Sequence, residues 1–448
     1  MAVDDIEIPM LLKNERNLIW IDEILRPILE QDDFISSIGG TYINIFKNYI
    51  VVNTVNNSKV NDLLSLPQII PYKDFLYFNK AYNSLSQMQH DFSGIKFLVY
   101  QLRPKRLFIY TDMEINNNVI YIIDRNFNNS EFIDATRPFN PTIIFHKFQK
   151  NPSVSQNLAQ SRRDVDSHNL EVKVLGGDGI LNEYYGFPCS VGFWVTSIDP
   201  NDFYIVTAGH CDAFGVYSYY PWGSKSSSGL LIGPMNFNLT NNIYDVGIIS
   251  FEYQYEKNVV PTFSIRNDGE YQYKELIITN GAPVSSHNVH ICKSDYTTHL
   301  TCGRVFGLNG IATGYTEEED DLYDLIITDF YSAKGDSGGP AFSFGSPQNL
   351  YSVVLHGIFV ILNSAIQPID KIFKALYEHE RYYKLYLGRC GVHKNFILNL
   401  NCGPILQDRA NLRKKFFTQS FSCLSEKNFL LIGYVFGVKF HKINDITY

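Results

Sequence analysis

Two periods of apolar residues divide the N-terminal third of the chain into helical and extended segments. In residues 17–31 apolar side chains recur every three or four positions, which predicts a helix that Pro27 kinks or ends. Residues 40–55 and 107–124 each contain two strand-like runs around a short polar turn, and each predicts a β-hairpin. Residues 81–94 lie between the hairpins and predict a second helix, closed by its final glycine. We therefore expect a small α+β domain here.

The pattern is lost in residues 149–169, which are polar and poor in large apolar side chains. We expect an exposed linker here. Arg162 and Arg163 form a dibasic pair within it. Such a pair is a natural site for a processing protease, because cleavage concentrates in exposed polar linkers. A plain solvated loop is the alternative. The first predicted domain, with its linker, spans residues 1–163.

Short apolar runs separated by turns replace the mixed pattern from Val174 onward. Runs such as "CSVGFWVTS", "DFYIVTAGH" and "YDVGIISF" predict strands, and residues 366–387 predict one helix beginning near Pro368. Many short strands with little helix between them are typical of β-sandwiches and β-barrels. We expect a β domain over residues 174–387, followed by a C-terminal extension, residues 388–448, in which no clear pattern occurs.

Composition and charge exclude several classes of protein. A chain of 448 residues is longer than one ordinary domain, and 45% hydrophobic with 19% charged residues is typical of a globular protein. The formal net charge is −8 and no basic stripe occurs, so we expect no nucleic-acid partner. No apolar run reaches the length of about 18 residues that a membrane-spanning helix needs. Residues 1–17 carry acids where a secretory signal carries positive charge, so no signal peptide is expected in them.

The seven cysteines and three glycosylation sequons bear on the cellular compartment. Four of the cysteines form two close pairs around strand-like segments, and we favour two disulfides over buried free thiols, which implies an oxidising compartment. No C-x-x-C unit occurs, so no metal site is expected. The sequons begin at Asn56, Asn128 and Asn238 and permit glycosylation. The two expected disulfides join Cys189 to Cys211 and Cys292 to Cys302. The sequence does not indicate partners for Cys390, Cys402 and Cys423.

A serine on a glycine-rich turn is the strongest chemical feature of the sequence. In "SAKGDSGGP" two glycines follow Ser337, and glycine suits a turn that brings the backbone close to a ligand. Acyl transfer by serine needs a general base, an acid that orients the base, and donors for the oxyanion. His210 ends a predicted strand beside Cys211 and is the candidate base, and Asp245 begins an apolar strand and is the candidate acid. Gly335 and Ser337 are the candidate N–H donors.

The motifs "TAGHC", "YDVGI" and "GDSGGP", in this order, resemble those of the chymotrypsin-type serine peptidases. Both cysteine pairs and "VLGGDG" at residues 174–179 are most similar to the streptogrisin and α-lytic branch, in which such a segment begins the mature enzyme. The resemblance covers residues 174–385. It implies a mainly β fold of two six-stranded antiparallel β-barrels. It also implies hydrolysis of peptide or protein substrates without a cofactor.

The N-terminal segment is similar to the pro-region of the same branch. The likeness lies in "GGTYINIFKNYIVVNTVN" and "YTDMEINNNVIYIID". It implies that residues 1–163 form a smaller α+β pro-domain, which aids folding and then inhibits the enzyme in cis until cleavage near Arg163. A template of this kind has a physical use, because β domains with many non-local contacts fold slowly.

The resemblance also implies roles around the serine. Asp336 is expected to be buried and to pair with Lys293, because an unpaired buried carboxylate is costly. The chain departs from the family at three positions. Ala333 stands where the family has a half-cystine, and His356 stands where it has a serine that helps to hold the aspartate. Ile358 stands where it has a small residue that opens the pocket. The residues expected to line the substrate pocket are Tyr331, Ser332, Ala333, Lys334, His356 and Ile358.

Two functions of different classes fit these features. The first is a serine endopeptidase made as a zymogen, in which His210, Asp245 and Ser337 act through an acyl-enzyme. The alternative is a catalytically silent binding module with a peptidase fold. The presence of all three residues favours the enzyme. An esterase is less expected, because it more often carries G-x-S-x-G on an α/β-hydrolase frame. We expect a monomer in the extracellular space or the secretory pathway, with no membrane association.

Overall fold

The computed structural model describes most of the chain before residue 389. The described ranges are 7–146, 171–182, 186–212, 215–222, 229–241, 243–252, 259–267, 274–315, 321–346, 349–362 and 365–388. The chain divides into two compact units, Met1–Arg389 and Cys390–Tyr448, and the description below concerns the first. The predicted processing site, Arg163, and three cysteines, Cys390, Cys402 and Cys423, lie outside the described residues.

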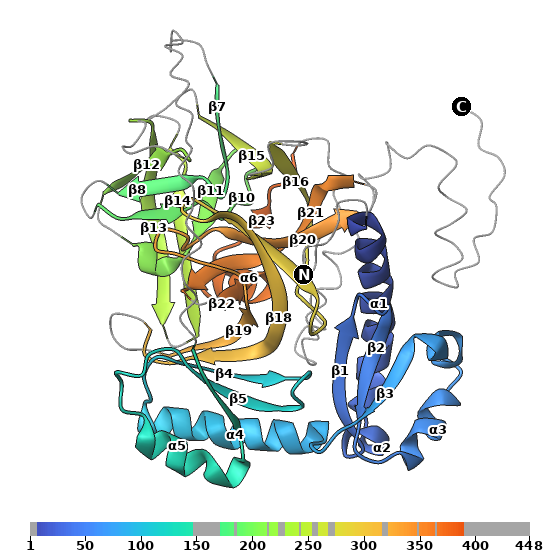
Figure 1. Ribbon diagram of the computed structural model, residues 1–448. Coiled ribbons are helices and arrows are strands. Elements are labelled where there is room, and N and C mark those ends of the chain that lie inside the picture. Colours follow the sequence, from blue (N-terminus) through green and yellow to red (C-terminus); the bar gives the residue numbers. More distant parts are fainter. Residues whose placement is uncertain are drawn as a thin grey trace, which may run out of the picture. The chain divides into compact units, whose positions relative to one another are not determined.

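The N-terminal region combines helices with two groups of strands (Figure 1). The long helix α1 (Ile8–Leu29) has a proline in its first turn, where the missing N–H costs no hydrogen bond. Pro27 lies in its last turn, so the predicted helix forms but begins well before residue 17. The other helices are α2 (Asp32–Ile35), α3 (Ser58–Leu64), α4 (Leu85–Leu102) and α5 (Ser130–Thr136).

The helix predicted to end at Gly94 continues past it. Gly94 lies inside α4, and the ring of Phe139 packs so closely against it that a Cβ would collide. Close packing, rather than chain termination, explains this glycine. The helix instead begins at a serine, Ser84, whose hydroxyl caps the N–H of Gln87 at 3.2 Å.

Both predicted hairpins of the N-terminal region form. Asn48 and Asn116 lie in their turns with φ of 55°, a conformation that asparagine tolerates better than most residues. The first group of strands is β1 (Ile38–Asn44), its antiparallel partner β2 (Tyr49–Thr54) and the parallel β3 (Leu76–Lys80). The second is β4 (Leu107–Asp112), its antiparallel partner β5 (Asn117–Ile122) and the parallel β6 (Thr142–Phe145).

The rest of the described chain is mainly β, as predicted, and its first sheet has the strand order β23-β10-β11-β14-β13-β12-β8-β9. Every residue of β14 is buried, which explains its nearly continuous apolar sequence. The strands are β8 (Gly179–Asn182), β9 (Pro188–Ser190), β10 (Phe193–Thr196), β11 (Phe203–Thr207), β12 (Val216–Tyr220), β13 (Leu231–Asn241), β14 (Tyr244–Ser250) and β23 (Lys384–Leu385).

The second sheet runs in the order β6-β5-β4-β18-β17-β20-β21-β16-β15-β7, with β19 and β22 attached to β18 and β21. Its strands beyond the N-terminal region are β7 (Val172–Gly176), β15 (Val259–Arg266), β16 (Glu275–Gly281), β17 (His290–Asp295), β18 (His299–Ala312), β19 (Leu322–Thr328), β20 (Pro340–Ser346), β21 (Asn349–Ile361) and β22 (Ala365–Pro368). The two sheets hold eight and twelve strands, more than the six expected of each barrel, partly because β4, β5 and β6 extend the second sheet. The predicted late helix is α6 (Ile369–Glu378).

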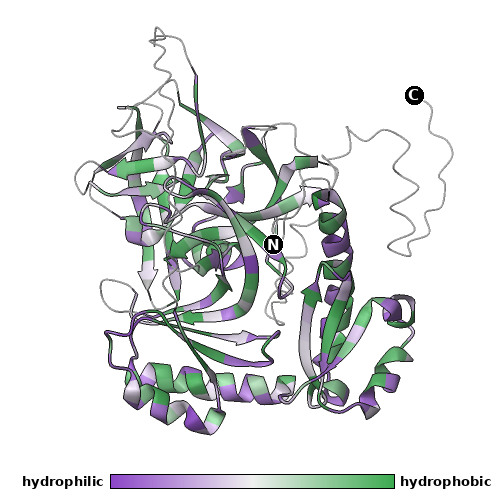
Figure 2. Cartoon of the chain, viewed as in Figure 1, coloured by the Kyte–Doolittle hydropathy of each residue, from purple (hydrophilic) through white to green (hydrophobic). Residues whose placement is uncertain are grey.

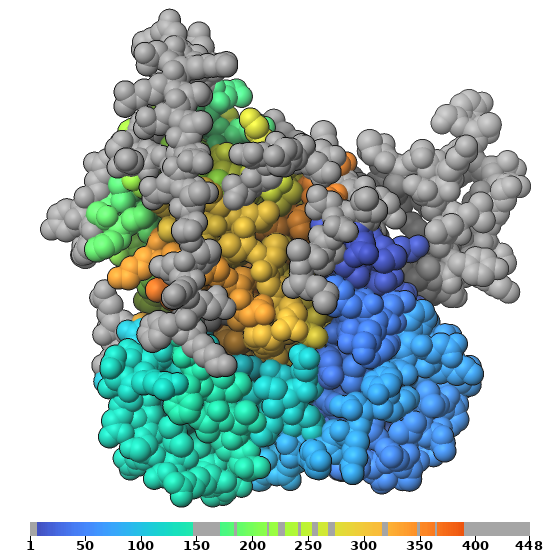
Figure 3. Space-filling view, viewed as in Figure 1, coloured from blue at the N-terminus to red at the C-terminus, as the bar shows by residue number. Residues whose placement is uncertain are grey.

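The N-terminal region contacts the β region through a sheet edge and a helix face. β4 pairs antiparallel with β18, so strands far apart in sequence form one continuous sheet (Figure 1). The apolar side of α1 contributes to a hydrophobic core that also contains residues of β17 and β21, and Figure 2 shows the two-sided character of this helix. In the space-filling view the blue and cyan surface of the N-terminal region adjoins the yellow and orange surface of the β region (Figure 3).

Buried acids of α1 fix this contact. Both carboxylate oxygens of Glu15 bind His290, one of them accepting its backbone N–H at 2.7 Å. Asp22 is fully buried and accepts hydrogen bonds from the hydroxyls of Thr41 and Ser286, each at 2.7 Å. These residues contact the β region over sequence separations of more than 250, so they specify one arrangement of the two regions.

Candidate active site

Ser337 lies on a tight turn between β19 and β20. Gly335 and Gly338 flank it with φ of 100° and 92°, a backbone conformation that favours glycine. A Cβ at Gly338 would also collide with the carbonyl oxygen of Ser190. The Gly338 N–H donates to the carbonyl of Phe359 at 2.7 Å, which fastens the turn to β21. The glycines of "GDSGGP" are therefore needed both for backbone conformation and for close approach.

His210 and Asp245 meet because β11 and β14 are paired. His210 lies in a short 3-10 turn directly after β11, and Asp245 is the second residue of β14. The distance between His210 Nδ1 and Asp245 Oδ2 is 2.6 Å, and the His210 backbone N–H donates to Oδ1 at 2.8 Å. A carboxylate accepts hydrogen bonds, so Nδ1 donates to Asp245, and in a neutral ring Nε2 is then the nitrogen that can accept a proton.

β9 is joined to the histidine turn through a disulfide and to the serine turn through a hydrogen bond. Cys189 and Cys211 are bonded, and the Cys211 sulfur lies 3.9 Å from the carbonyl oxygen of Ser337. Ser190 donates its N–H to the same carbonyl at 2.7 Å. The structure thus brings the segments that carry His210, Asp245 and Ser337 together. The Ser337 hydroxyl itself makes no hydrogen bond to another described residue.

Two peptide groups of the serine turn are fixed by hydrogen bonds to their carbonyl oxygens, which orients their N–H groups. Thr297 donates its hydroxyl to the carbonyl of Lys334 at 2.7 Å, which anchors the peptide whose N–H belongs to Gly335. Gly339 donates its N–H to the carbonyl of Asp336 at 3.0 Å, which anchors the peptide whose N–H belongs to Ser337. Within the part of the chain that the structure describes, neither the Gly335 nor the Ser337 N–H donates to another residue. Two anchored, unused donors suit an oxyanion hole.

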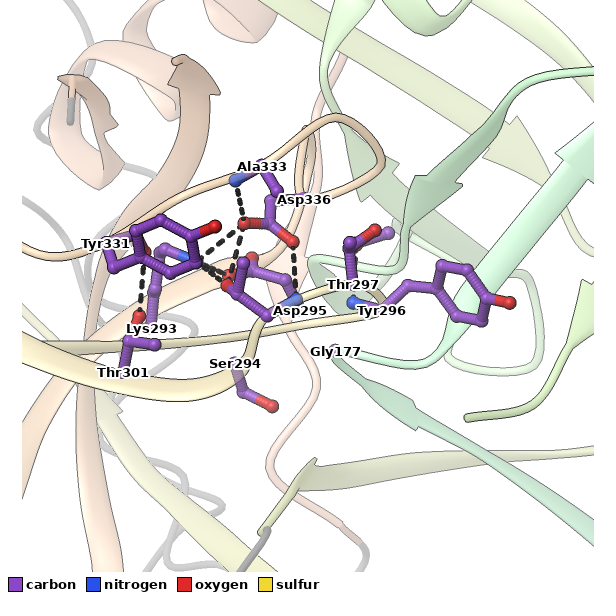
Figure 4. A network of polar contacts seen from close by, with 12 residues as sticks. Gly177, Lys293, Ser294, Asp295, Tyr296, Thr297, Thr301, Tyr331, Ala333 and Asp336 are labelled. Carbon is purple, nitrogen blue, oxygen red and sulfur yellow. Dashed lines mark hydrogen bonds and ion pairs between the residues drawn. The ribbon is translucent and has the colours of Figure 1, made fainter. Parts of the chain in front are cut away.

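A buried ion pair supports the same turn (Figure 4). Lys293 and Asp336 are fully buried, and Nζ lies 3.0 Å from Oδ2. The Asp336 carboxylate also accepts the Thr298 N–H at 2.9 Å, the Thr298 hydroxyl at 2.7 Å and the Ala333 N–H at 2.8 Å. These contacts tie the turn to the β17–β18 hairpin, whose strands are joined by the second disulfide, between Cys292 and Cys302.

A second carboxylate, Asp295, belongs to this network and was missed by the sequence reasoning. Asp295 is fully buried and contacts the Lys293 ammonium. Burial raises the pKa of Asp295 well above its ordinary value; Lys293 opposes that rise and Asp336 adds to it. A usable signal was present, because residues two apart in a strand share a face, and Lys293 and Asp295 both lie in β17.

The first four predicted pocket residues lie beside the serine turn. Tyr331, Ser332 and Ala333 are half-buried, and Lys334 is exposed. The Tyr331 carbonyl accepts a hydrogen bond from the Thr301 hydroxyl at 3.2 Å. This hydrogen bond attaches the segment to β18.

His356 and Ile358 lie in β21, in which Ile358 pairs with Pro340 at the end of the serine turn. His356 is buried, with Nδ1 at 2.7 Å from the Ala282 carbonyl and Nε2 at 2.8 Å from the Ser343 hydroxyl. Ile358 is fully buried in the core. Phe359 of β21 pairs with the serine turn, while the hydrogen bonds of His356 go to Ala282 and Ser343 rather than to Asp245.

Another residue takes the place beside Asp245. Gln367 is fully buried, and its Oε1 accepts the backbone N–H of Asp245 at 3.3 Å. Gln367 was not predicted, and its position follows from the pairing of β21 with β22, in which it faces Ile358. No sequence motif marks it.

Other predicted features can be placed only in part. Among the described residues there is no group of three or more His, Cys, Asp or Glu side chains suited to a metal ion. None of the described helices is long and apolar enough to cross a membrane. The first residues of the three sequons, Asn56, Asn128 and Asn238, are all exposed.

No protein-family model matches the chain. Among solved structures, it is similar to Thermobifida fusca protease A at 18% identity and a TM-score of 0.37, covering 48% of this chain and 100% of that one. A Nocardiopsis protease matches at 18% identity and a TM-score of 0.36, covering 48% and 99%. An α-lytic protease homologue matches at 19% identity and a TM-score of 0.34, covering 47% and 98%. All three of these structures are proteases.

Proposed function

We propose that the protein is a serine endopeptidase that works through an acyl-enzyme. The single observation that best supports this is the buried Asp245 carboxylate 2.6 Å from His210 Nδ1. The turn that carries His210 is disulfide-bonded to Cys189, and the next residue, Ser190, hydrogen-bonds to the Ser337 carbonyl. The buried Glu15–His290 contact shows that a carboxylate–imidazole pair can also be structural, but of the two only the His210 turn is linked through Cys189 and Ser190 to the serine turn. A base oriented in this way is what a serine nucleophile needs.

The proposed reaction uses atoms in defined roles. Ser337 Oγ attacks the scissile carbonyl carbon while its proton moves to His210 Nε2. The tetrahedral oxyanion accepts hydrogen bonds from the N–H groups of Gly335 and Ser337. Nε2 then gives the proton to the leaving amine, the C–N bond breaks and an ester to Ser337 remains. Water hydrolyses the ester by the reverse sequence. The bond between hydroxyl and imidazole is expected to close when substrate binds, because such bonds are often loose in unliganded sites.

We propose further that the N-terminal region is a cis-acting folding aid and inhibitor, removed by cleavage near Arg163. Two contacts favour this role. β4 extends the second sheet at β18, and Glu15 of α1 binds His290 in β17, the strand that also carries Lys293. A template bound at these non-local strands lowers the cost of assembling them. The two disulfides are compatible with an extracellular protein.

The activity is tested with a fluorophosphonate probe, which labels an activated serine. We expect labelling that His210→Ala and Ser337→Ala abolish and that the matched surface variant His90→Gln retains, because His90 is exposed on α4. Absence of labelling in the processed wild-type protein would contradict the proposal and favour a silent binding module.

The zymogen proposal has a separate test. The chain is expressed in an oxidising host, and the N-terminus of the mature product is sequenced. A new terminus between Arg163 and Val174 supports it. An intact chain that hydrolyses peptides would refute it while leaving the peptidase proposal standing.

A further inference from the structure

The charges around the serine turn do not balance. Lys293, Asp295 and Asp336 are all fully buried, and Lys293 Nζ contacts both carboxylates. Among the described residues it is the one basic group that contacts either of them. Two ionised carboxylates sharing one ammonium would leave a net negative charge in a site shielded from solvent, which is costly. One of the two acids is therefore expected to keep a proton.

The hydrogen bonds identify which acid is ionised. Asp336 accepts from the Thr298 N–H, the Thr298 hydroxyl, the Ala333 N–H and Lys293, and several donors of this kind stabilise a carboxylate. Asp295 has only Lys293 near Oδ2, and its Oδ1 has no hydrogen-bond partner in the described part of the chain. Oδ1 instead lies against Gly339, where a Cβ would have no room. The proton therefore belongs on Asp295, in agreement with the raised pKa of its carboxyl group.

Resting on the proposed function, we propose that Asp295 is a positioning residue of the active site that holds the serine turn only while its carboxyl group is protonated. In that form it leaves the Lys293 charge to Asp336, whose carboxylate binds Ala333 N–H and so fixes the turn. Loss of the proton to solvent makes the two carboxylates compete for Lys293 and repel each other. The turn that carries Gly335 and Ser337 then loosens, and activity falls as the pH rises through the ionisation of Asp295.

The first test measures the rate of fluorophosphonate labelling between about pH 6 and 10 for wild type, Asp295→Asn and Asp324→Asn. Asp324 is a half-exposed carboxylate paired with Lys371 and serves as the matched control. We expect the wild-type and Asp324→Asn rates to fall about tenfold per pH unit above the ionisation of Asp295. The labelling rate of Asp295→Asn should vary by less than about threefold across this pH range, because the amide is neutral throughout. The proposal would be overturned if the labelling rate of Asp295→Asn fell with rising pH as steeply as that of wild type. It would also be overturned if Asp295→Asn were labelled about ten times more slowly than wild type near pH 7.

The second test needs no activity, so it separates failure of this proposal from failure of the proposed function. In a Ser337→Ala background, the unfolding equilibrium constants of the protein with and without the Asp295→Asn substitution are compared by urea titration. The folded protein keeps a proton that the unfolded chain releases above about pH 4, so the stability of the protein with Asp295 should fall relative to Asp295→Asn as pH rises. We expect the ratio of the two unfolding equilibrium constants to change about tenfold per pH unit. The change should level off at the pH where labelling of the active protein declines. A ratio independent of pH would overturn the proposal.

Discussion

Buried neutral histidines should make this protein sensitive to mild acid, and His356 offers the sharpest case. Burial lowers the pKa of His356 from 6.5 to about 4; the hydrogen bond to the Ala282 carbonyl partly opposes this, and His290 adds to it. The perturbation we consider is His356→Gln, which keeps a donor and an acceptor of similar size but cannot take up a proton. Ser337→Ala serves as the background, so that self-cleavage does not disturb the measurement.

The sign and size of the effect follow from the two protonation states. Below pH 6.5 the unfolded chain binds a proton at His356, while the folded chain does not until the pH nears 4. The stabilising contribution is therefore complete above pH 6.5 and is lost as the pH falls toward 4. Each pH unit in this window is worth about 1.4 kcal/mol, so the total is roughly 3 kcal/mol. His287, whose pKa burial also lowers to about 4, acts in the same direction and remains in the variant.

The assay is urea unfolding followed by tryptophan fluorescence at several pH values between about 7.5 and 4.5. Wild type should lose stability as the pH falls, and His356→Gln should lose it less steeply, by one proton or about 1.4 kcal/mol per pH unit. The exposed control His90→Gln should keep the wild-type slope. Equal slopes for wild type and His356→Gln would refute the reasoning, because they would mean that the buried ring takes up its proton as easily as a ring in the unfolded chain.

Three further predictions concern the serine turn and its supports. Asp245→Asn should lower kcat by about four orders of magnitude by favouring the wrong imidazole tautomer, as measured by peptide hydrolysis. Replacing both Cys189 and Cys211 by alanine should cost about 3 kcal/mol of unfolding free energy, because the disulfide closes a loop between residues 22 apart in sequence, and a loss below about 1 kcal/mol would contradict this. Lys293→Met should destabilise the fold by about 3–5 kcal/mol, since it leaves the buried Asp336 carboxylate without a cation; urea titration measures this loss, and a neutral effect would show that the pair is not ionised.

Local signals in the sequence were enough for much of the fold. The helical period of residues 17–31 predicts α1, and the alternating runs of residues 107–124 predict the β4–β5 hairpin. Side-chain period is a property of a single segment, so it can be read without knowing what the segment contacts. The end of α4 was predicted wrongly because Gly94 serves a contact with Phe139, which no neighbour in sequence reveals.

Part of the candidate site was likewise predictable from local sequence, and part was not. The turn "GDSGGP" and the strand end "TAGHC" could be recognised from the residues alone, because their glycines and flanking strands impose local backbone geometry. The place of His356 could not, because it depends on the register between β20 and β21, and a shift of a few residues leaves the local pattern unchanged. Burial of Glu15 and Asp22 was likewise decided only by tertiary structure. The partners in the β region that compensate these two carboxylates for their lost hydration are more than 250 residues away, so no sequence window contains both members of either contact.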